Sequence, residues 1–181
     1  VYKRQTTNTP VVEPSDLKGV VIRTPSNSLR VKTFEAFGAT PISISFSELY
    51  QSLSQHICDA QENPLATIVS SQFYDYQSCL CISNHVYTPG WICMNLDLYN
   101  SLSDAQRAVI DEAGALTSAH VLEAGAKADE ENLQVCKDKG MQVTYADVEE
   151  FRNVVLPLWD KFADSVGGID FVNAAKAALG Y

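Results

Sequence analysis

The sequence contains no apolar run of about 18 residues, the length that a helix needs to cross a membrane. Positive charge is also scarce, because 13 Lys and Arg stand against 22 Asp and Glu, a net charge of −9. An acidic surface speaks against nucleic acid and anionic membrane as partners. We therefore expect no nucleic-acid partner and no direct membrane insertion, and an anionic ligand would need a local cationic pocket.

Cysteine is also scarce, and its odd number excludes a complete set of disulfides. The sequence has five: Cys58, Cys79, Cys81, Cys93 and Cys136. Cys79 and Cys81 lack the second pair that a zinc site normally supplies. His56 and His85 lie close to cysteines in the sequence, which keeps a metal site as an alternative. We expect no metal, no cofactor, and thiols that pack as small hydrophobic side chains.

The first half of the chain alternates short apolar strands with amphipathic helices. Strands are predicted over residues 20–24, 41–46 and 57–61. The helices that follow begin at typical capping residues: Ser26 or Asn27, then Ser47, then Asn63-Pro64. This alternation predicts an α/β fold with a parallel sheet flanked by helices.

Three side chains fall at the carboxyl ends of these strands, where ligands bind in open α/β sheets. Arg23 offers a planar fork of donors, Phe46 an apolar wall, and Asn63 an amide at a predicted helix start. Each also has an ordinary structural role, as a surface ion-pair partner, a core ring or a helix cap. Their recurrence at equivalent strand ends predicts a carboxylate site.

The second half contains one long helix. Ser103 and Gln106 form a capping box, and the helix is expected to stop near Gly140. Its apolar stripe changes face part-way, which indicates contact with two different domains or a bent surface helix. Further strands are predicted over residues 79–86, 91–96 and 141–145, and further helices over 148–166 and 171–179.

Four ordered blocks of the sequence resemble the DctP-type substrate-binding proteins of TRAP transporters. They are DLKGVVIRTPSN, GATPISISFSELYQSL, DAQENPLATIVSSQFYDYQ and SNHVYTPGWICMNLDLYNSLSDAQRAVI. Nearly all of the signal lies between Asp16 and about Ile110. The remainder matches the family's long helix and C-terminal helices in layout only.

The resemblance implies a type II periplasmic-binding-protein-like α/β fold, with two α/β domains joined by a hinge and a long bridging helix. On this reading, residues 1–88 and 156–181 form the second domain. Residues 89–155 are the returning segment of an incomplete first domain. We expect the chain to be a fragment whose full-length form has a signal peptide. The expected location is periplasmic, or extracellular and lipid-anchored in a Gram-positive source.

The family's ligand-binding roles can be carried over residue by residue. Arg23 is similar to the arginine that pairs with the carboxylate, Phe46 to the ring against the ligand, and Asn63 to the amide donor. His85 corresponds to a cleft residue of some members, and Ser26 stands where certain members have Asn. We expect Glu62 to orient the neighbouring donors.

Arg4 has two interpretations. The family often has an arginine before a TTN-like segment, where it contacts the ligand, and Arg4 in RQTTN matches that pattern. Alternatively, VYKRQ translates the end of a common sequencing adaptor, and Arg4 is then foreign to the gene. The sequence leaves both open.

The resemblance implies a binding protein that captures a small organic carboxylate and presents it to the membrane subunits of a TRAP transporter. No catalytic residues are expected. One alternative is a carboxylate-processing enzyme that uses Cys58 and His56, which a short strand would place on one face. The other is an interaction module without a ligand.

Overall fold

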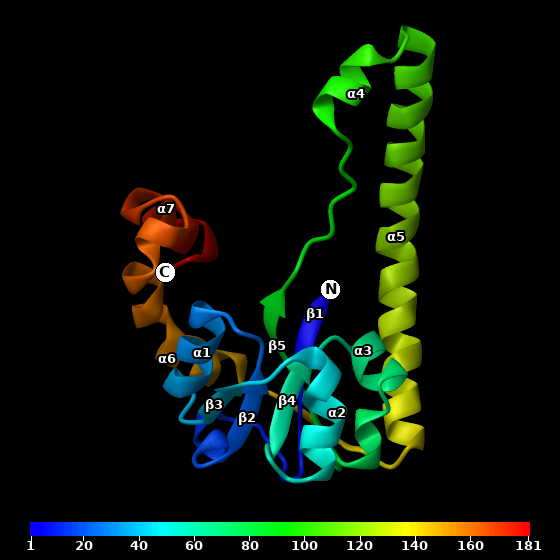
Figure 1. Ribbon diagram of the computed structural model, residues 1–181. Helices are drawn as coiled ribbons and strands as arrows, with labels where there is room; N and C mark the ends of the chain where they lie inside the picture. Colours follow the sequence, from blue (N-terminus) through cyan, green and yellow to red (C-terminus); the bar gives the residue numbers. More distant parts are fainter.

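The computed structural model describes residues 1–181 and is built around one six-stranded sheet (Figure 1). The strand order is β3-β2-β4-β1-β5-β6. The strands are β1 (Tyr2–Thr7), β2 (Val21–Thr24), β3 (Thr40–Ser43), β4 (Ala60–Asn63), β5 (Cys79–Tyr87) and β6 (Gln142–Tyr145). The mixed α/β architecture confirms the predicted fold class.

The sheet as a whole is mixed, but the three strands predicted in the first half, β2, β3 and β4, are parallel as expected. β2 pairs in parallel with β3 and β4, and β5 pairs in parallel with β6. β1 lies between β4 and β5 and runs antiparallel to both. No pattern predicted this strand, because its polar sequence YKRQTT lacks an apolar face.

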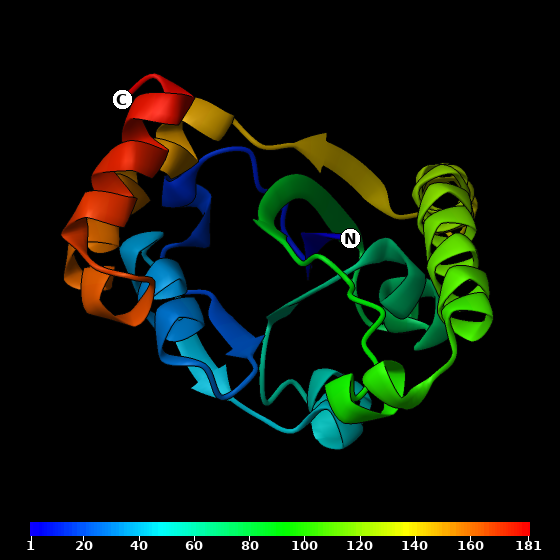
Figure 2. The same cartoon turned by 90° about the horizontal axis from the view of Figure 1, so that it is seen from above.

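Helices cover both faces of the sheet, with α1 and α6 on one side and α3 and α5 on the other, while α7 packs beside α6 (Figure 2). The helices are α1 (Ser28–Ala36), α2 (Phe46–Ser54), α3 (Leu65–Ser70), α4 (Leu96–Ser101), α5 (Asp104–Asp138), α6 (Val148–Lys161) and α7 (Ile169–Leu179). Three 3-10 turns complete the chain: η1 (Pro14–Leu17), η2 (Phe73–Asp75) and η3 (Ala163–Ser165). None of the helices is both long and apolar enough to cross a membrane.

Each face of the sheet has its own hydrophobic core. We call the first the α1 face, where Ile22, Ala60 and Cys81 pack with Phe34 of α1 and Phe151 of α6. We call the second the α3 face, whose core residues from the helices are Leu49, Leu53, Leu65, Ile68 and Cys136. Since side chains of a regular strand alternate between faces, this assignment also places the polar residues of β2 and β4.

The long helix α5 begins as predicted, with the Ser103 hydroxyl accepting from the Gln106 N–H in a capping box. Only its C-terminal part packs against the sheet domain, through Leu133 and Cys136. Its N-terminal part extends far beyond the sheet (Figure 1), and the apolar side chains of that part are exposed, Leu122 by 74%. The change of apolar face does not coincide with the change in packing, because Leu122 lies on the same predicted face as Leu133 and Cys136 and is nevertheless exposed.

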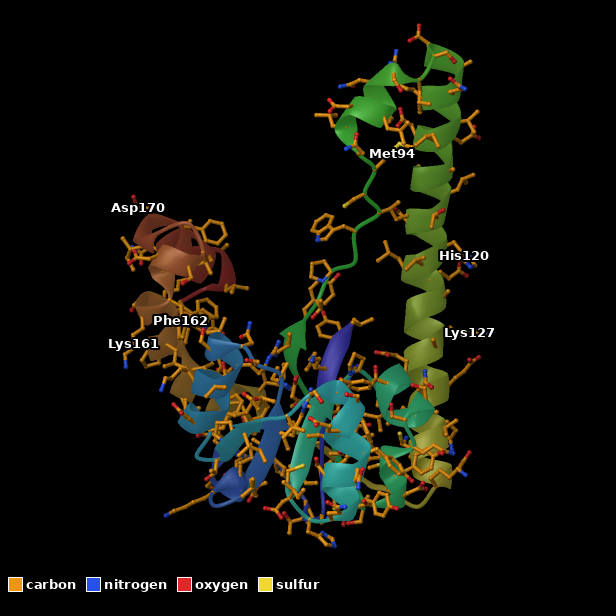
Figure 3. The ribbon with its side chains drawn as sticks, viewed as in Figure 1. Met94, His120, Lys127, Lys161, Phe162 and Asp170 are labelled. Atoms are coloured by element: carbon orange, nitrogen blue, oxygen red, sulfur yellow. The ribbon has the colours of Figure 1, made fainter.

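Several predicted boundaries are wrong. The third strand starts at Ala60 instead of Ile57, and Asn63 ends it without capping α3, whose N-cap is Pro64. Ser45, not Ser47, precedes α2. The strand predicted over 91–96 is absent, because residues 88–95 form an extended segment without sheet partners. Met94 lies in this segment, and His120 lies in the middle of α5 (Figure 3).

The helix predicted over 148–166 stops earlier than expected. α6 ends at Lys161, and η3 separates it from α7. Lys161 and Phe162 lie at this end of α6 (Figure 3). Pro157 lies within α6, where its missing N–H removes one hydrogen bond of the helix.

Candidate functional site

Arg23 is a buried cation with unused hydrogen-bonding capacity. It lies near the carboxyl end of β2, on the α3 face, and is only 4% exposed. Its Nε donates to the carbonyl of Ile44 at 2.8 Å, and its two terminal nitrogens make no hydrogen bond within the protein. Burial lowers the pKa of Arg23, and the charges of Glu62 and Cys58 oppose that shift. A carboxylate could therefore bind to the two terminal nitrogens of the guanidinium, which have no partner in the protein.

Asn63 and Arg4 lie on the same face as Arg23. Asn63 is directly opposite Arg4 in the ladder between β4 and β1, and Gln61 is beside Arg23 in the ladder between β4 and β2. Directly opposed residues present their side chains to the same face. Three neighbouring strands thus bring Arg23, Asn63 and Arg4 to one edge of the sheet, as predicted for the first two.

Arg4 is already paired. Its Nη2 lies 2.9 Å from Oδ2 of Asp129 on α5, and its Nη1 donates to the Tyr2 carbonyl at 2.5 Å. Asn63 uses one amide hydrogen to bond Oε1 of Gln61 at 2.5 Å. Asp129 was not singled out in the sequence, because 125 residues separate it from Arg4.

A series of hydrogen bonds between buried side chains holds the strands in position on the α3 face. Gln61 Nε2 donates to Oγ1 of Thr6 at 2.8 Å, and Thr6 in turn donates to Oε1 of Gln77 at 3.1 Å. Gln77 then donates to the carbonyl of Asp59 at 3.2 Å. Buried polar groups are normally paired in this way. The polar run of β4 therefore serves partly to hold the strand's own position.

Glu62 lies on the opposite face, the α1 face, and is surrounded by basic side chains. Its carboxylate contacts Lys3 Nζ at 2.9 Å, His85 Nε2 at 3.2 Å and Arg30 Nη1 at 3.6 Å. Its side chain is fully buried. Burial would raise the pKa of Glu62, but His85, Arg30 and Lys3 together lower it. Glu62 is thus the counter-ion of a buried basic cluster.

His85 is held as a neutral ring by this arrangement. Burial lowers its pKa, although the contact with Glu62 opposes the shift. Its Nδ1 lies 2.7 Å from Oγ of Ser83, and its Nε2 faces Glu62. Because the Glu62 carboxylate can only accept, Nε2 carries the proton and Nδ1 accepts from Ser83. The ring also packs edge-on against Phe34, 5.3 Å between centroids.

The remaining two predicted residues lie at the ends of connecting loops. Phe46 is the first residue of α2, is 51% exposed, and packs edge-on against Phe73. Two residues separate it from the end of β3 at Ser43, so it is not the strand end that was predicted. Ser26 is exposed in the loop before α1, where Asn27, not Ser26, caps the helix by accepting from the Arg30 N–H.

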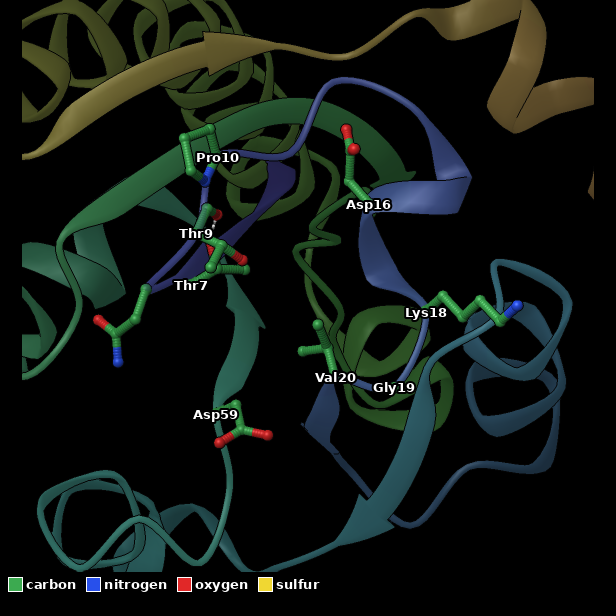
Figure 4. Close-up of a pocket in the computed structure, with 9 residues that line it drawn as sticks. Thr7, Thr9, Pro10, Asp16, Lys18, Gly19, Val20 and Asp59 are labelled. Carbon is green, nitrogen blue, oxygen red and sulfur yellow. Dashed lines mark hydrogen bonds between the residues drawn. The ribbon is translucent and has the colours of Figure 1, made fainter.

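A cavity of about 490 Å³ lies at the other end of the sheet (Figure 4). Its lining includes Thr7, Asp16, Lys18 and Asp59 and contains none of the predicted site residues. Both carboxylates are engaged, since Asp59 accepts from the Val21 N–H and Asp16 from the Val12 and Glu13 N–H groups. Because both carboxylates are engaged within the protein and the lining contains no arginine, we favour the α3 face around Arg23 as the site.

Comparison with known families shows the family to which this chain belongs. The model of the family described as bacterial extracellular solute-binding protein, family 7 (DctP), matches residues 2–165. This chain belongs to the DctP family. The match covers nearly the whole chain and confirms the resemblance inferred from four sequence blocks.

Individual members of the DctP family show how far the similarity extends. The sialic acid-binding periplasmic protein SiaP of Vibrio cholerae is 30% identical over 165 residues, 91% of this chain and 51% of the relative. The 2,3-diketo-L-gulonate-binding periplasmic protein YiaO of Escherichia coli is 36% identical over 113 residues, 61% of this chain and 34% of the relative. This chain thus spans about half the length of SiaP.

Solved structures of TRAP periplasmic solute-binding proteins have the same fold. One from Shewanella oneidensis, with bound succinate, has a TM-score of 0.79 and 33% identity over 98% of this chain and 59% of that one. Another, from Ochrobactrum anthropi, has a TM-score of 0.90 and 31% identity over 98% of this chain and 57% of that one. A third, from Polaromonas, is bound to D-erythronate, with a TM-score of 0.80 and 30% identity over 97% and 58%.

The pair Cys58 and His56, the enzymatic alternative, does not have the geometry of a nucleophile and its base. His56 lies in a turn with a left-handed φ of 56° and is exposed, while Cys58 is buried in the α3-face core. Neither lies on a strand. Burial raises the pKa of the Cys58 thiol to about 11, so the reactive thiolate is suppressed. DctP proteins are binding subunits of transporters, consistent with this geometry.

The structure holds no group of three or more His, Cys, Asp or Glu side chains that could bind a metal ion. Cys79 and Cys81 are both buried in β5, where they pair with Thr7 and Gln5 of β1, and Leu80 lies between them. All five cysteines are free thiols.

Proposed function

We propose that this chain supplies the carboxylate-binding half of a solute-binding protein that captures a small organic acid for a TRAP-type transporter. The observation that carries the proposal is Arg23. Its guanidinium is buried, its two terminal nitrogens have no partner in the protein, and it lies at the carboxyl end of β2. A buried cation with free donors is well suited to a desolvated carboxylate.

The surrounding residues would have distinct roles. We propose that Asn63 donates its second amide hydrogen to the ligand and that Phe46 forms an apolar wall. Arg4 and Ser26 would contact the distal part of the ligand. Glu62 and His85 lie on the other face of the sheet, so we propose that they act through the strands: they fix β4 and β5 without touching the ligand.

The names of the similar proteins support a carboxylate as the ligand. The relative SiaP is named for binding sialic acid, and two of the similar solved structures hold succinate and D-erythronate. These acids differ greatly in size, but each carries a carboxylate, the group that Arg23 would bind. This chain's own ligand is a member of that class.

The membrane subunits of a TRAP transporter are the proposed partner, and the proposed location is the periplasm. SiaP and YiaO are both named as periplasmic proteins. A lipid-anchored extracellular form is the corresponding proposal for a source with a single membrane.

The division into two domains also remains a proposal, with one boundary moved. β6 pairs with β5, and Phe151 belongs to the α1-face core. We therefore propose that the sheet domain comprises residues 1–88 and about 141–181. The extended segment, α4 and α5 would connect it to the other domain, whose closure would shelter the ligand.

Substitution of Arg23 tests the proposal. Calorimetric titration of the full-length protein with succinate and D-erythronate should show that Arg23→Ala weakens binding by about 100-fold and Arg23→Lys by about tenfold, since a lysine cannot form the bidentate pair. Arg152→Lys is the matched control, because Arg152 pairs only with Glu149 on α6. Unchanged affinity in both Arg23 variants would contradict the proposal.

A further inference from the structure

The ion pair between Arg4 and Asp129 joins the sheet to the long helix. Arg4 Nη2 and Asp129 Oδ2 lie 2.9 Å apart, and the side chains are 8% and 30% exposed. Arg4 comes from β1 and Asp129 from the part of α5 that begins to pack on the sheet domain. The pair lies on the α3 face, the same face as Arg23.

The two arginines differ in what they can offer a ligand. Arg23 has both terminal nitrogens free. Arg4 gives Nη1 to the Tyr2 carbonyl and Nη2 to Asp129, and its Nε is buried without a partner. A second bidentate carboxylate contact at Arg4 would therefore have to displace Asp129.

The spacing of the two arginines suits a short ligand. They lie on β2 and β1, which are separated by β4. Neighbouring strands are about 4.8 Å apart and a strand rises about 3.3 Å per residue. Arg23 is beside Gln61 and Arg4 is opposite Asn63, two residues further along β4, so the two backbone positions are roughly 12 Å apart. Long arginine side chains can close much of this distance. A four-carbon acid anchored at Arg23 would then place its far end next to Arg4 and Asp129.

We propose that Asp129 determines which acids the site accepts, favouring hydroxylated monocarboxylates over dicarboxylates. A second carboxylate at the far end would meet the negative charge of Asp129. A hydroxyl there could donate to Oδ1 of Asp129, an atom that has no hydrogen bond within the protein. Specificity of this kind arises from repulsion as much as from attraction. The inference rests on the proposed function, because it assumes a carboxylate anchored at Arg23.

The test compares two acids with the same number of carbons, succinate and D-erythronate. Titration calorimetry on the full-length protein should show tighter binding of D-erythronate. Asp129→Asn should strengthen succinate binding by about tenfold without strengthening that of D-erythronate, because it removes the repulsion. Asp129→Glu keeps the charge and should keep the preference for D-erythronate.

Glu130→Gln is the control for a change of charge on α5, since Glu130 is exposed and forms no ion pair. It should leave the ratio of the two dissociation constants unchanged. The same ratio in wild type and Asp129→Asn, or tighter wild-type binding of succinate, would overturn the inference while leaving the carboxylate function standing. Failure of the wild type to bind either acid would overturn the proposed function itself, and this inference with it.

Discussion

The imidazole of His85 and the carboxylate of Glu62 lie 3.2 Å apart in the interior, although 23 residues separate them in the chain. They come from β5 and β4, which do not pair with each other because β1 lies between them. β1 contributes Lys3 to the same cluster. The cluster therefore links β1, β4 and β5 on the α1 face, opposite the face that carries Arg23.

Glu62→Gln should lower the free energy of unfolding by about 3 kcal/mol, because removing one partner leaves Lys3 and Arg30 as uncompensated cations. Urea denaturation monitored by circular dichroism measures the change. Glu130→Gln, an exposed substitution of the same chemistry, should change it by less than about 0.5 kcal/mol. Equal effects of the two would show that the buried cluster adds nothing to stability.

Stability should fall between pH 7.5 and 5.5 through His85. Its pKa in the folded state lies below the ordinary value of 6.5, so below that pH the unfolded state binds a proton that the folded state does not. The loss reaches at most about 1.4 kcal/mol per pH unit. Glu62 has a lowered pKa too, but its contribution is complete above its ordinary value of 4.5 and is lost only as the pH falls further.

Unfolding in urea at both pH values should therefore give a smaller pH dependence in His85→Gln than in the wild type. His120→Gln is the control, because His120 is exposed on α5. An unchanged pH dependence in His85→Gln would mean that another group causes it.

The native protein should show one fast-reacting thiol. Burial raises the pKa of Cys58, Cys81 and Cys136 to about 11, whereas Cys93 is exposed. A disulfide reagent such as dithionitrobenzoate, used at pH 8, should therefore release one equivalent of chromophore rapidly. Cys93→Ser should abolish that phase. Rapid release of a second equivalent of chromophore would indicate that one of the buried cysteines becomes readily accessible to the reagent.

The two halves of α5 should respond differently to truncation of a leucine. Leu133 packs against the α3-face core, and Leu133→Ala should lower the free energy of unfolding of this chain by about 1–2 kcal/mol. Leu122 is 74% exposed, and Leu122→Ala should change it by less than about 0.5 kcal/mol. Equal losses in urea denaturation would show that the N-terminal half of α5 is packed in solution.

Local features of the sequence determined much of this structure. The capping box at Ser103 and the uninterrupted pattern after it predicted the start and length of α5, because capping and helix periodicity depend on residues three or four apart. The strands at 21–24 and 79–87 were likewise evident from their β-branched and apolar residues. Arg23 could be placed near the end of its strand because it follows the apolar residues of β2, and Asn63 because Pro64 comes directly after it.

Tertiary structure alone decided the rest. β1 has no apolar face of its own and becomes a central strand only because β4 and β5 supply hydrogen-bonding partners on both sides. The start of β4 at Ala60 and its pairing place Glu62 on the α1 face with His85, and Asn63 on the α3 face with Arg4. The partnership of Arg4 with Asp129 spans 125 residues. Ion pairs at such separations leave no periodic signal, because they depend on which elements the sheet order brings together.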